Sequence, residues 1–94
     1  MAPAAITIAA APGTISIFFA ANSEPDIAGY KIFRSDDSAM PKSSWTILTK
    51  EPSPNNTFQD SNIKSGKKYF YFVTAVDKFG NESLPSEVVS ETAP

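Results

Sequence analysis

One stretch of the chain, residues 63–77, constrains the fold more than any other. It reads Ile-Lys-Ser-Gly-Lys-Lys-Tyr-Phe-Tyr-Phe-Val-Thr-Ala-Val-Asp. After the turn signal Ser65-Gly66, nearly every residue from 68 to 77 is β-branched or aromatic, which is typical of a strand. Side chains alternate between the two faces of a strand, so this run predicts a central strand with two apolar faces. The first face carries Tyr69, Tyr71, Val73 and Ala75, and the second carries Phe70, Phe72, Thr74 and Val76.

Six further segments have strand character, and turn signals rich in proline, glycine, asparagine and aspartate separate them. They are residues 6–9, 14–19, 29–34, 45–49, 57–60 and 87–92. No segment has the periodicity of a helix. Together with residues 68–77, these segments predict an all-β fold, a sandwich of antiparallel sheets.

The same alternation predicts which side chains fill the core between the sheets. The inward positions are Ile15, Ile17, Phe19, Tyr30, Ile32, Phe58, Tyr69, Tyr71 and Val73. We expect Ile27 to close one end of the core, next to a turn at residues 22–26.

The composition fits one small globular domain and excludes several kinds of site. The 94 residues carry a net charge of −2, which argues against binding to nucleic acid or to an anionic membrane. Because cysteine and histidine are absent, disulfides, thiolate zinc sites and the usual nucleophile–base pairs are excluded. No apolar run approaches the ~20 residues of a membrane span, and no signal peptide is present. Because Met1-Ala2 leads directly into strand-like sequence, we expect one domain, residues 1–94, taken from a longer protein.

Four motifs, in order along the chain, carry a resemblance to a known family. They are Ile15-x-Ile17-x-Phe19, residues 22–35, residues 63–77, and Gly80-Asn81-Glu82-Ser83-x-Pro85-Ser86. Over essentially its whole length the chain resembles a fibronectin type III domain, and the combination of residues 26–35 with residues 75–83 resembles the bacterial branch of that family. The resemblance implies a seven-stranded, immunoglobulin-like β-sandwich whose two antiparallel sheets have the strands A-B-E and C-C′-F-G.

The resemblance also gives Tyr69 a structural role. Tyr69 occupies the position of the family's tyrosine corner, in which the hydroxyl bonds to backbone in the preceding loop. Two positions depart from the family pattern: Phe19 stands where tryptophan is frequent, and Ser65 stands where proline is common. Both departures are compatible with the fold, because Phe19 still fills a core and Ser65-Gly66 still forms a turn.

The expected function follows from the resemblance and not from any reactive group. Bacterial members of the family commonly lie between domains of extracellular polysaccharide-degrading enzymes and surface proteins. We therefore expect a monomeric, non-catalytic spacer and interaction module of a larger secreted or surface bacterial protein, located outside the cell. Its expected partners are neighbouring domains of the same parent chain; neither nucleic acid nor membrane insertion is predicted. The alternative is a module that binds carbohydrate or another protein.

Carboxylates lie in or beside the predicted loops, at Asp26, Asp36, Asp37, Asp60 and Asp77. A pair of them would be needed for a glycosidase site, but a small filled sandwich offers no cleft. We therefore interpret them as solvated loop carboxylates. Asp36-Asp37, or Asp77 with Asn81, supplies oxygen ligands of the type that calcium binds. Since no calcium-loop spacing supports such a site, the sequence predicts no metal, no cofactor and no catalytic residue.

Four aromatic residues define the candidate contact surface. Phe70 and Phe72 share the second face of residues 68–77, Phe33 points outward from the neighbouring strand, and Trp45 is expected at its side. We call Phe33, Phe70, Phe72 and Trp45 the aromatic stripe. If it were open, the stripe would mark a contact surface for a neighbouring domain, a partner protein or sugar rings. We favour the other arrangement, in which residues 35–44 or the strand of Trp45 fold over the rings.

Overall fold

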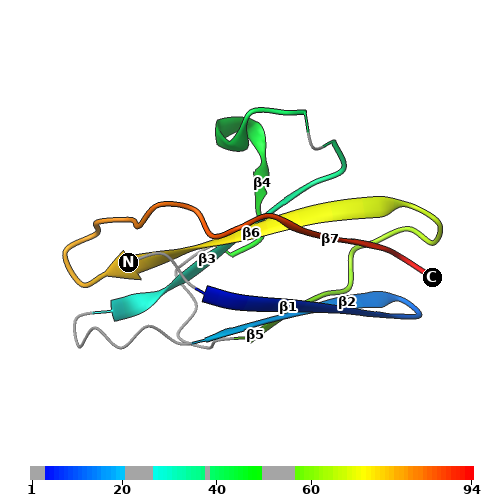
Figure 1. Ribbon diagram of the computed structural model, residues 1–94, viewed down its shortest axis with the longest axis horizontal. Helices are drawn as coiled ribbons and strands as arrows, with labels where there is room; N and C mark the ends of the chain where they lie inside the picture. The colour runs from blue at the N-terminus through cyan, green and yellow to red at the C-terminus, as the bar shows by residue number, and fades with distance from the viewer. Residues whose placement is uncertain (1–3, 21–26, 38, 50–56) are drawn as a thin grey trace.

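The computed structural model describes residues 4–20, 27–37, 39–49 and 57–94 of the chain. The strands in these ranges are β1 (Ala4–Ala11), β2 (Thr14–Ala20), β3 (Ile27–Ser35), β4 (Thr46–Ile47), β5 (Thr57–Asp60), β6 (Lys68–Asp77) and β7 (Val89–Thr92). A single 3₁₀ turn, η1 (Lys42–Ser44), precedes β4. Two antiparallel sheets, ordered β1-β2-β5 and β4-β3-β6-β7, pack face to face (Figure 1). These orders confirm the predicted seven-stranded sandwich and its division into sheets of three and four strands.

The observed strand bounds agree best with the predicted ones where the alternation is strongest. β5 and β6 have the predicted bounds, and β2 ends one residue later than predicted. β6 lies between β3 and β7, which confirms that it is a central strand. β1 and β3 are longer than predicted, whereas β4 and β7 are shorter. The turn predicted at residues 22–26 lies outside the described residues.

The core lies between the two sheets, where the predicted inward residues meet. Its buried members are Ile15, Ile17, Phe19, Tyr30, Ile32, Tyr69, Tyr71, Val73, Ala75 and Ala93. Phe19 packs edge-on against Tyr30, with ring centroids 4.7 Å apart. Ile27 and Phe58 are partly buried against this cluster. The predicted core is therefore confirmed, and Phe19 fills the position where the family often has tryptophan.

Tyr69 forms the tyrosine corner that the resemblance implied. The backbone N–H of Lys64 donates a hydrogen bond of 2.8 Å to the Tyr69 hydroxyl. The bond joins the start of β6 to the loop that enters it, so the buried ring does not leave its hydroxyl without a partner. Gly66 turns this loop with a φ of +83°, and its N–H donates to the carbonyl of Ala93.

The segment before β7 pairs with β6 through serine side chains, which is why β7 begins later than predicted. Pro85 has no N–H to donate to a strand ladder. The hydroxyl of Ser83 accepts the Ala75 N–H at 2.9 Å, and the hydroxyl of Ser86 accepts the Val73 N–H at 2.8 Å. The two hydroxyls thus satisfy donors of β6 that carbonyls of a regular neighbouring strand would otherwise satisfy.

Replacing Ser86 tests this pairing. Ser86→Ala should lower the free energy of unfolding by about 1–3 kcal/mol, because it leaves the buried Val73 N–H without an acceptor. Ser83→Ala is the matched control and should cost less, since its bond is partly exposed and water can replace the hydroxyl. Urea denaturation measures both values. Equal, small losses in the two variants would contradict the role given to Ser86.

Candidate functional site

The aromatic stripe lies on the outer face of the four-stranded sheet, and its rings pack on one another. Phe33 and Phe72 are partners in the β3–β6 register, and their rings stack with centroids 4.5 Å apart and planes 8° apart. Trp45 packs on Phe72 at 5.1 Å. The exposed fractions are 9 % for Phe33, 3 % for Phe72 and 6 % for Trp45. Three of the four rings are therefore buried, and Phe70 is partly buried.

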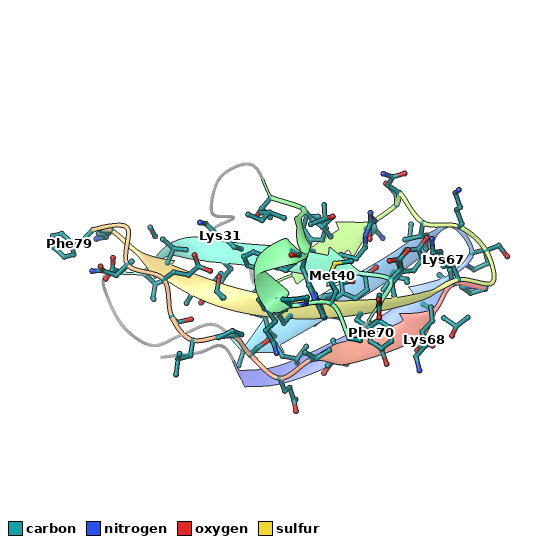
Figure 2. The ribbon with its side chains drawn as sticks, turned by 90° about the horizontal axis from the view of Figure 1, so that it is seen from above. Lys31, Met40, Lys67, Lys68, Phe70 and Phe79 are labelled. Atoms are coloured by element: carbon teal, nitrogen blue, oxygen red, sulfur yellow. The ribbon has the colours of Figure 1, made fainter. Side chains whose placement is uncertain are left out.

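Residues of the connection from β3 to β4 cover the stripe. Met40 packs against the ring cluster, and the indole N–H of Trp45 donates a 2.9 Å hydrogen bond to the Met40 carbonyl. The Nζ of Lys42, in η1, lies 5.9 Å from the Phe72 ring centroid. Figure 2, which looks onto this face, shows η1 and Met40 over the sheet. The favoured arrangement, with residues 35–44 folded over the rings, is confirmed, and the open row that the binding alternative required is not present.

Three polar residues join the two sheets at the edge of the core. Asp60 ends β5 in one sheet, whereas Arg34 of β3 and Tyr71 of β6 belong to the other. Asp60 Oδ2 accepts hydrogen bonds from Arg34 Nη1 at 2.9 Å and from the Tyr71 hydroxyl at 2.8 Å. Arg34 Nη1 also donates to the backbone carbonyl of Asn62 at 2.9 Å. We call Arg34, Asp60 and Tyr71 the inter-sheet bridge.

The interpretation of Asp60 as a solvated loop carboxylate was wrong. Its exposed fraction is 4 %, and a buried carboxylate requires partners such as Arg34. The sequence did contain a signal. Arg34 lies two residues beyond the inward Ile32, and Asp60 lies two residues beyond the inward Phe58, so alternation places both charges on inner faces. Opposite charges at two inward strand ends indicate a buried ion pair.

Asp77 and Asp37 serve their own loops; Asp77 is partly buried and Asp37 is exposed. Asp77 accepts hydrogen bonds from the N–H groups of Phe79 and Asn81, both at 2.9 Å, and from the Asn81 amide at 3.1 Å. These bonds, those from Asn81 above all, lower the pKa of Asp77. Asp37 Oδ1 accepts the N–H of Ala39. Asp26 lies outside the described residues, and no cluster of three or more acidic residues that could hold a metal occurs within the described ranges.

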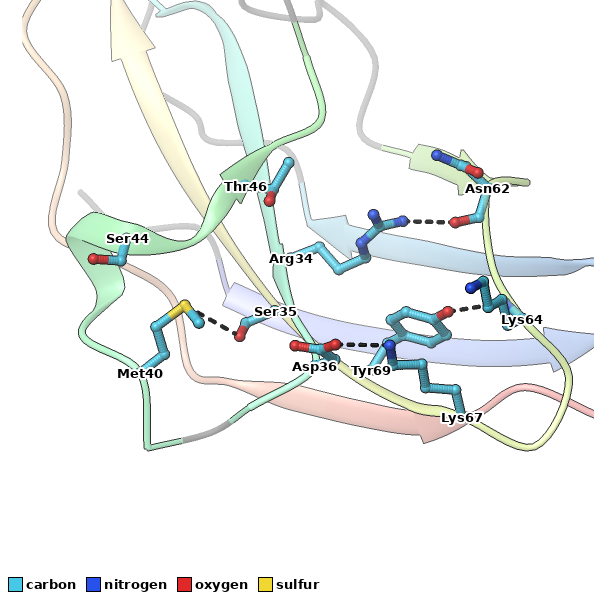
Figure 3. Close-up of a pocket in the computed structure, with 10 residues that line it drawn as sticks. All are labelled: Arg34, Ser35, Asp36, Met40, Ser44, Thr46, Asn62, Lys64, Lys67 and Tyr69. Carbon is cyan, nitrogen blue, oxygen red and sulfur yellow. Dashed lines mark hydrogen bonds and ion pairs between the residues drawn. The ribbon is translucent and has the colours of Figure 1, made fainter.

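A polar pocket of about 340 Å³ opens between β3, β4 and the loop that enters β6 (Figure 3). Its lining consists of Arg34, Ser35, Asp36, Met40, Ser44, Thr46, Asn62, Lys64, Lys67 and Tyr69. The Arg34 guanidinium lies 5.3 Å from the Tyr69 ring centroid, so the two form one wall. The sequence prediction missed this pocket, because its walls come from segments that only the folded chain brings together.

An exposed ion pair lies at the mouth of the pocket. Lys67 Nζ and Asp36 Oδ2 are 2.8 Å apart, and each side chain is nearly half exposed. The hydrogen bond from Lys67 lowers the pKa of Asp36, and the same bond raises the pKa of Lys67. Both groups are therefore charged at neutral pH. An exposed pair of this kind contributes little to stability, so Lys67 can exchange Asp36 for another anion at low cost.

Comparison with solved structures agrees with the fold described above. An Fn3-like protein from Clostridium thermocellum superposes with a TM-score of 0.81 at 24% identity, covering 100% of this chain and 93% of that chain. The fn3 domain of human contactin 1 has a TM-score of 0.81 at 16% identity, covering 99% of this chain and 76% of the other. This chain has the fibronectin type III fold. Neither a protein-family model nor a curated protein matches the sequence.

A third match shows the fibronectin type III fold as a small part of a long chain. A β-1,2-glucanase from Parabacteroides distasonis matches at 32% identity with a TM-score of 0.80, covering 98% of this chain but only 12% of the glucanase chain. The fold therefore occurs as most of one chain and as a minor part of another, which is typical of a modular domain. In the described ranges, no helical segment has the length and hydropathy that a membrane crossing needs.

Truncating Phe72 tests the covered stripe. Phe72→Ala should lower the free energy of unfolding by about 3–5 kcal/mol, because the ring is buried between Phe33 and Trp45. Phe70→Ala, at a partly buried ring of the same strand, is the control and should cost clearly less. Denaturation followed by Trp45 fluorescence measures both. If Phe72→Ala leaves the stability unchanged, the rings are not packed as described.

The inter-sheet bridge should appear in the alkaline stability of the domain. Burial first, and then the hydrogen bond to Asp60, raises the pKa of Tyr71 above its ordinary value of 10.0. Above that pH the unfolded chain ionises this phenol while the folded chain does not. The stability that neutral Tyr71 contributes is therefore complete below about pH 10 and is lost as the pH rises, by up to ~1.4 kcal/mol per pH unit.

Tyr71→Phe removes this ionisation from both states. Its free energy of unfolding should therefore fall less steeply above about pH 10 than that of the wild type. Urea denaturation at stepped pH measures the two slopes, and other titrating groups contribute equally to both. Identical slopes would show that the phenol of Tyr71 ionises as easily in the folded protein as in the unfolded chain.

Proposed function

We propose that this chain is a non-catalytic spacer and interaction module of a larger secreted or surface bacterial protein that degrades polysaccharide. The observation that carries the proposal is the 32% identity between 98% of this chain and 12% of the chain of a β-1,2-glucanase. Its partners are then the neighbouring domains of its own parent chain, outside the cell.

The structure supports a spacer in two ways. In the aromatic stripe, which would have been the binding face, the rings of Phe33, Phe72 and Trp45 are buried together and Met40 packs against them. In addition, β1 starts in the left half of Figure 1, and the C-terminus lies at the right-hand end. The longest dimension of the domain is 39 Å, and a chain that enters left of the centre and leaves at the right-hand end separates its neighbours along part of this axis.

Only one ring of the aromatic stripe, that of Phe70, remains partly exposed for the binding alternative. Phe70 is partly buried, with Lys68 Nζ 5.5 Å from its ring centroid. One half-covered ring does not provide the flat aromatic row on which sugar rings stack, so the spacer role is the better supported of the two.

Small-angle scattering of two copies joined tail to head tests the spacer role. The maximum dimension of the tandem should clearly exceed that of one copy, whose longest extent is 39 Å, and the single copy should sediment as a monomer. A tandem that folds back side by side would contradict a spacer. In a parallel assay the single domain should release no reducing sugar from β-1,2-glucan, and sustained release would contradict the non-catalytic assignment.

A further inference from the structure

We propose that the polar pocket between β3, β4 and residues 62–67 binds the carboxylate of an acidic sugar, a hexuronic acid residue. The proposal goes beyond the spacer role, which would stand if the pocket bound nothing. The volume of about 340 Å³ is at the small end of ligand pockets, which span roughly 300–1,000 Å³. A single small unit of a larger ligand suits this size.

The charges that line the pocket favour an anion. Among the described residues of the lining, Arg34, Lys64 and Lys67 supply three cations and Asp36 is the one acidic side chain. Asp60, just behind the wall, is paired with Arg34 at 2.9 Å. No described residue pairs with the ammonium group of Lys64. The domain as a whole is acidic, with a net charge of −2, so this local excess of cations is not a property of the whole surface.

In the Lys67–Asp36 pair, the Asp36 carboxylate occupies the place at Lys67 that a ligand carboxylate would take. At 2.8 Å, Asp36 occupies one side of the Lys67 ammonium group at the pocket mouth, as drawn in Figure 3. Because both side chains are nearly half exposed, the pair is weak and an incoming carboxylate can replace Asp36. Asp36 then acts as an internal competitor whose removal should tighten binding.

The remaining lining favours a sugar over a peptide as the carrier of the carboxylate. Ser44, Thr46 and Asn62 contribute hydroxyl and amide side chains, and no described residue forms a hydrogen bond with any of the three side chains. Such groups both donate and accept hydrogen bonds, as sugar hydroxyls do. Tyr69 and the stem of Met40 add limited apolar surface beside them. A carboxylate flanked by hydroxyl groups matches this set.

Titration of the 15N-labelled domain with sodium galacturonate tests the proposal by chemical-shift mapping. We expect saturable shifts that cluster at residues 34–36, 46 and 62–69, with a dissociation constant of ~1–10 mM, and weaker binding as salt rises. Galactose, which lacks the carboxylate, should give no saturable shifts at the same concentrations. Absence of saturation with galacturonate, or equal binding of galactose, would overturn the proposal.

Two pairs of variants distinguish specific binding in the pocket from non-specific attraction between opposite charges. The double variant Lys64→Gln/Lys67→Gln should weaken galacturonate binding about tenfold. The control double variant, Lys31→Gln/Lys78→Gln, removes the same charge outside the pocket and should leave the binding unchanged. Asp36→Asn should tighten binding about threefold, whereas Asp37→Asn, one residue outside the lining, should not. Equal effects within either pair would contradict a specific site.

A last titration decides between sugar and peptide. N-acetylalanine, like galacturonate, carries one carboxylate, but on a peptide-like body without sugar hydroxyls. It should bind several-fold more weakly than galacturonate. If it binds as tightly, the assignment to an acidic sugar is wrong and the pocket is a general carboxylate site.

Discussion

The structure depends on one constraint, which is that β6 presents an apolar face on each side. Every residue from Tyr71 to Val76 is buried, so a single opposing sheet does not suffice. The three-stranded sheet covers the face of Tyr71 and Val73, and the connection from β3 to β4 covers the face of Phe72. The second cover consists of few residues, yet it removes three large rings from water, and burial of each ring contributes about 2–3 kcal/mol.

This second cover also decides which surfaces remain for function. Because Met40 and Trp45 close the aromatic stripe, the outer face of the four-stranded sheet has no open apolar row. The same connection continues from Asp36 at the end of β3, and it forms one side of the polar pocket. The described residues of this connection therefore link the two features: Met40 and Trp45 exclude water from Phe72, and Asp36 pairs with Lys67. A domain of this kind has a closed hydrophobic face and a polar, cationic recess at one end.

The fold could be predicted from the sequence because the alternation of inward and outward side chains recurs along each strand. In β2 and β6 the inward side chains recur at every second position, and the tyrosine corner at Tyr69 has a fixed place relative to them. The sequence predictions were wrong or incomplete where the burial of a side chain, or the shape of a pocket, depends on residues far away in the sequence. Asp60 is buried only because Arg34 neutralises it, and the pocket forms only when β4 and residues 62–67 come together. The late start of β7 follows from Ser83 and Ser86, whose hydroxyls accept the β6 N–H groups that strand carbonyls would otherwise accept.

Hydrogen exchange of the Trp45 indole N–H tests the central claim, that residues 36–45 close the outer face, most directly. This N–H donates to the Met40 carbonyl inside the cover, and the Trp45 side chain is buried. Since the cover must open before exchange, the N–H should exchange at least about a hundredfold more slowly than a free indole under the same conditions. Exchange at the rate of a free indole would contradict the account, because the rings of Phe33 and Phe72 would then be open to water.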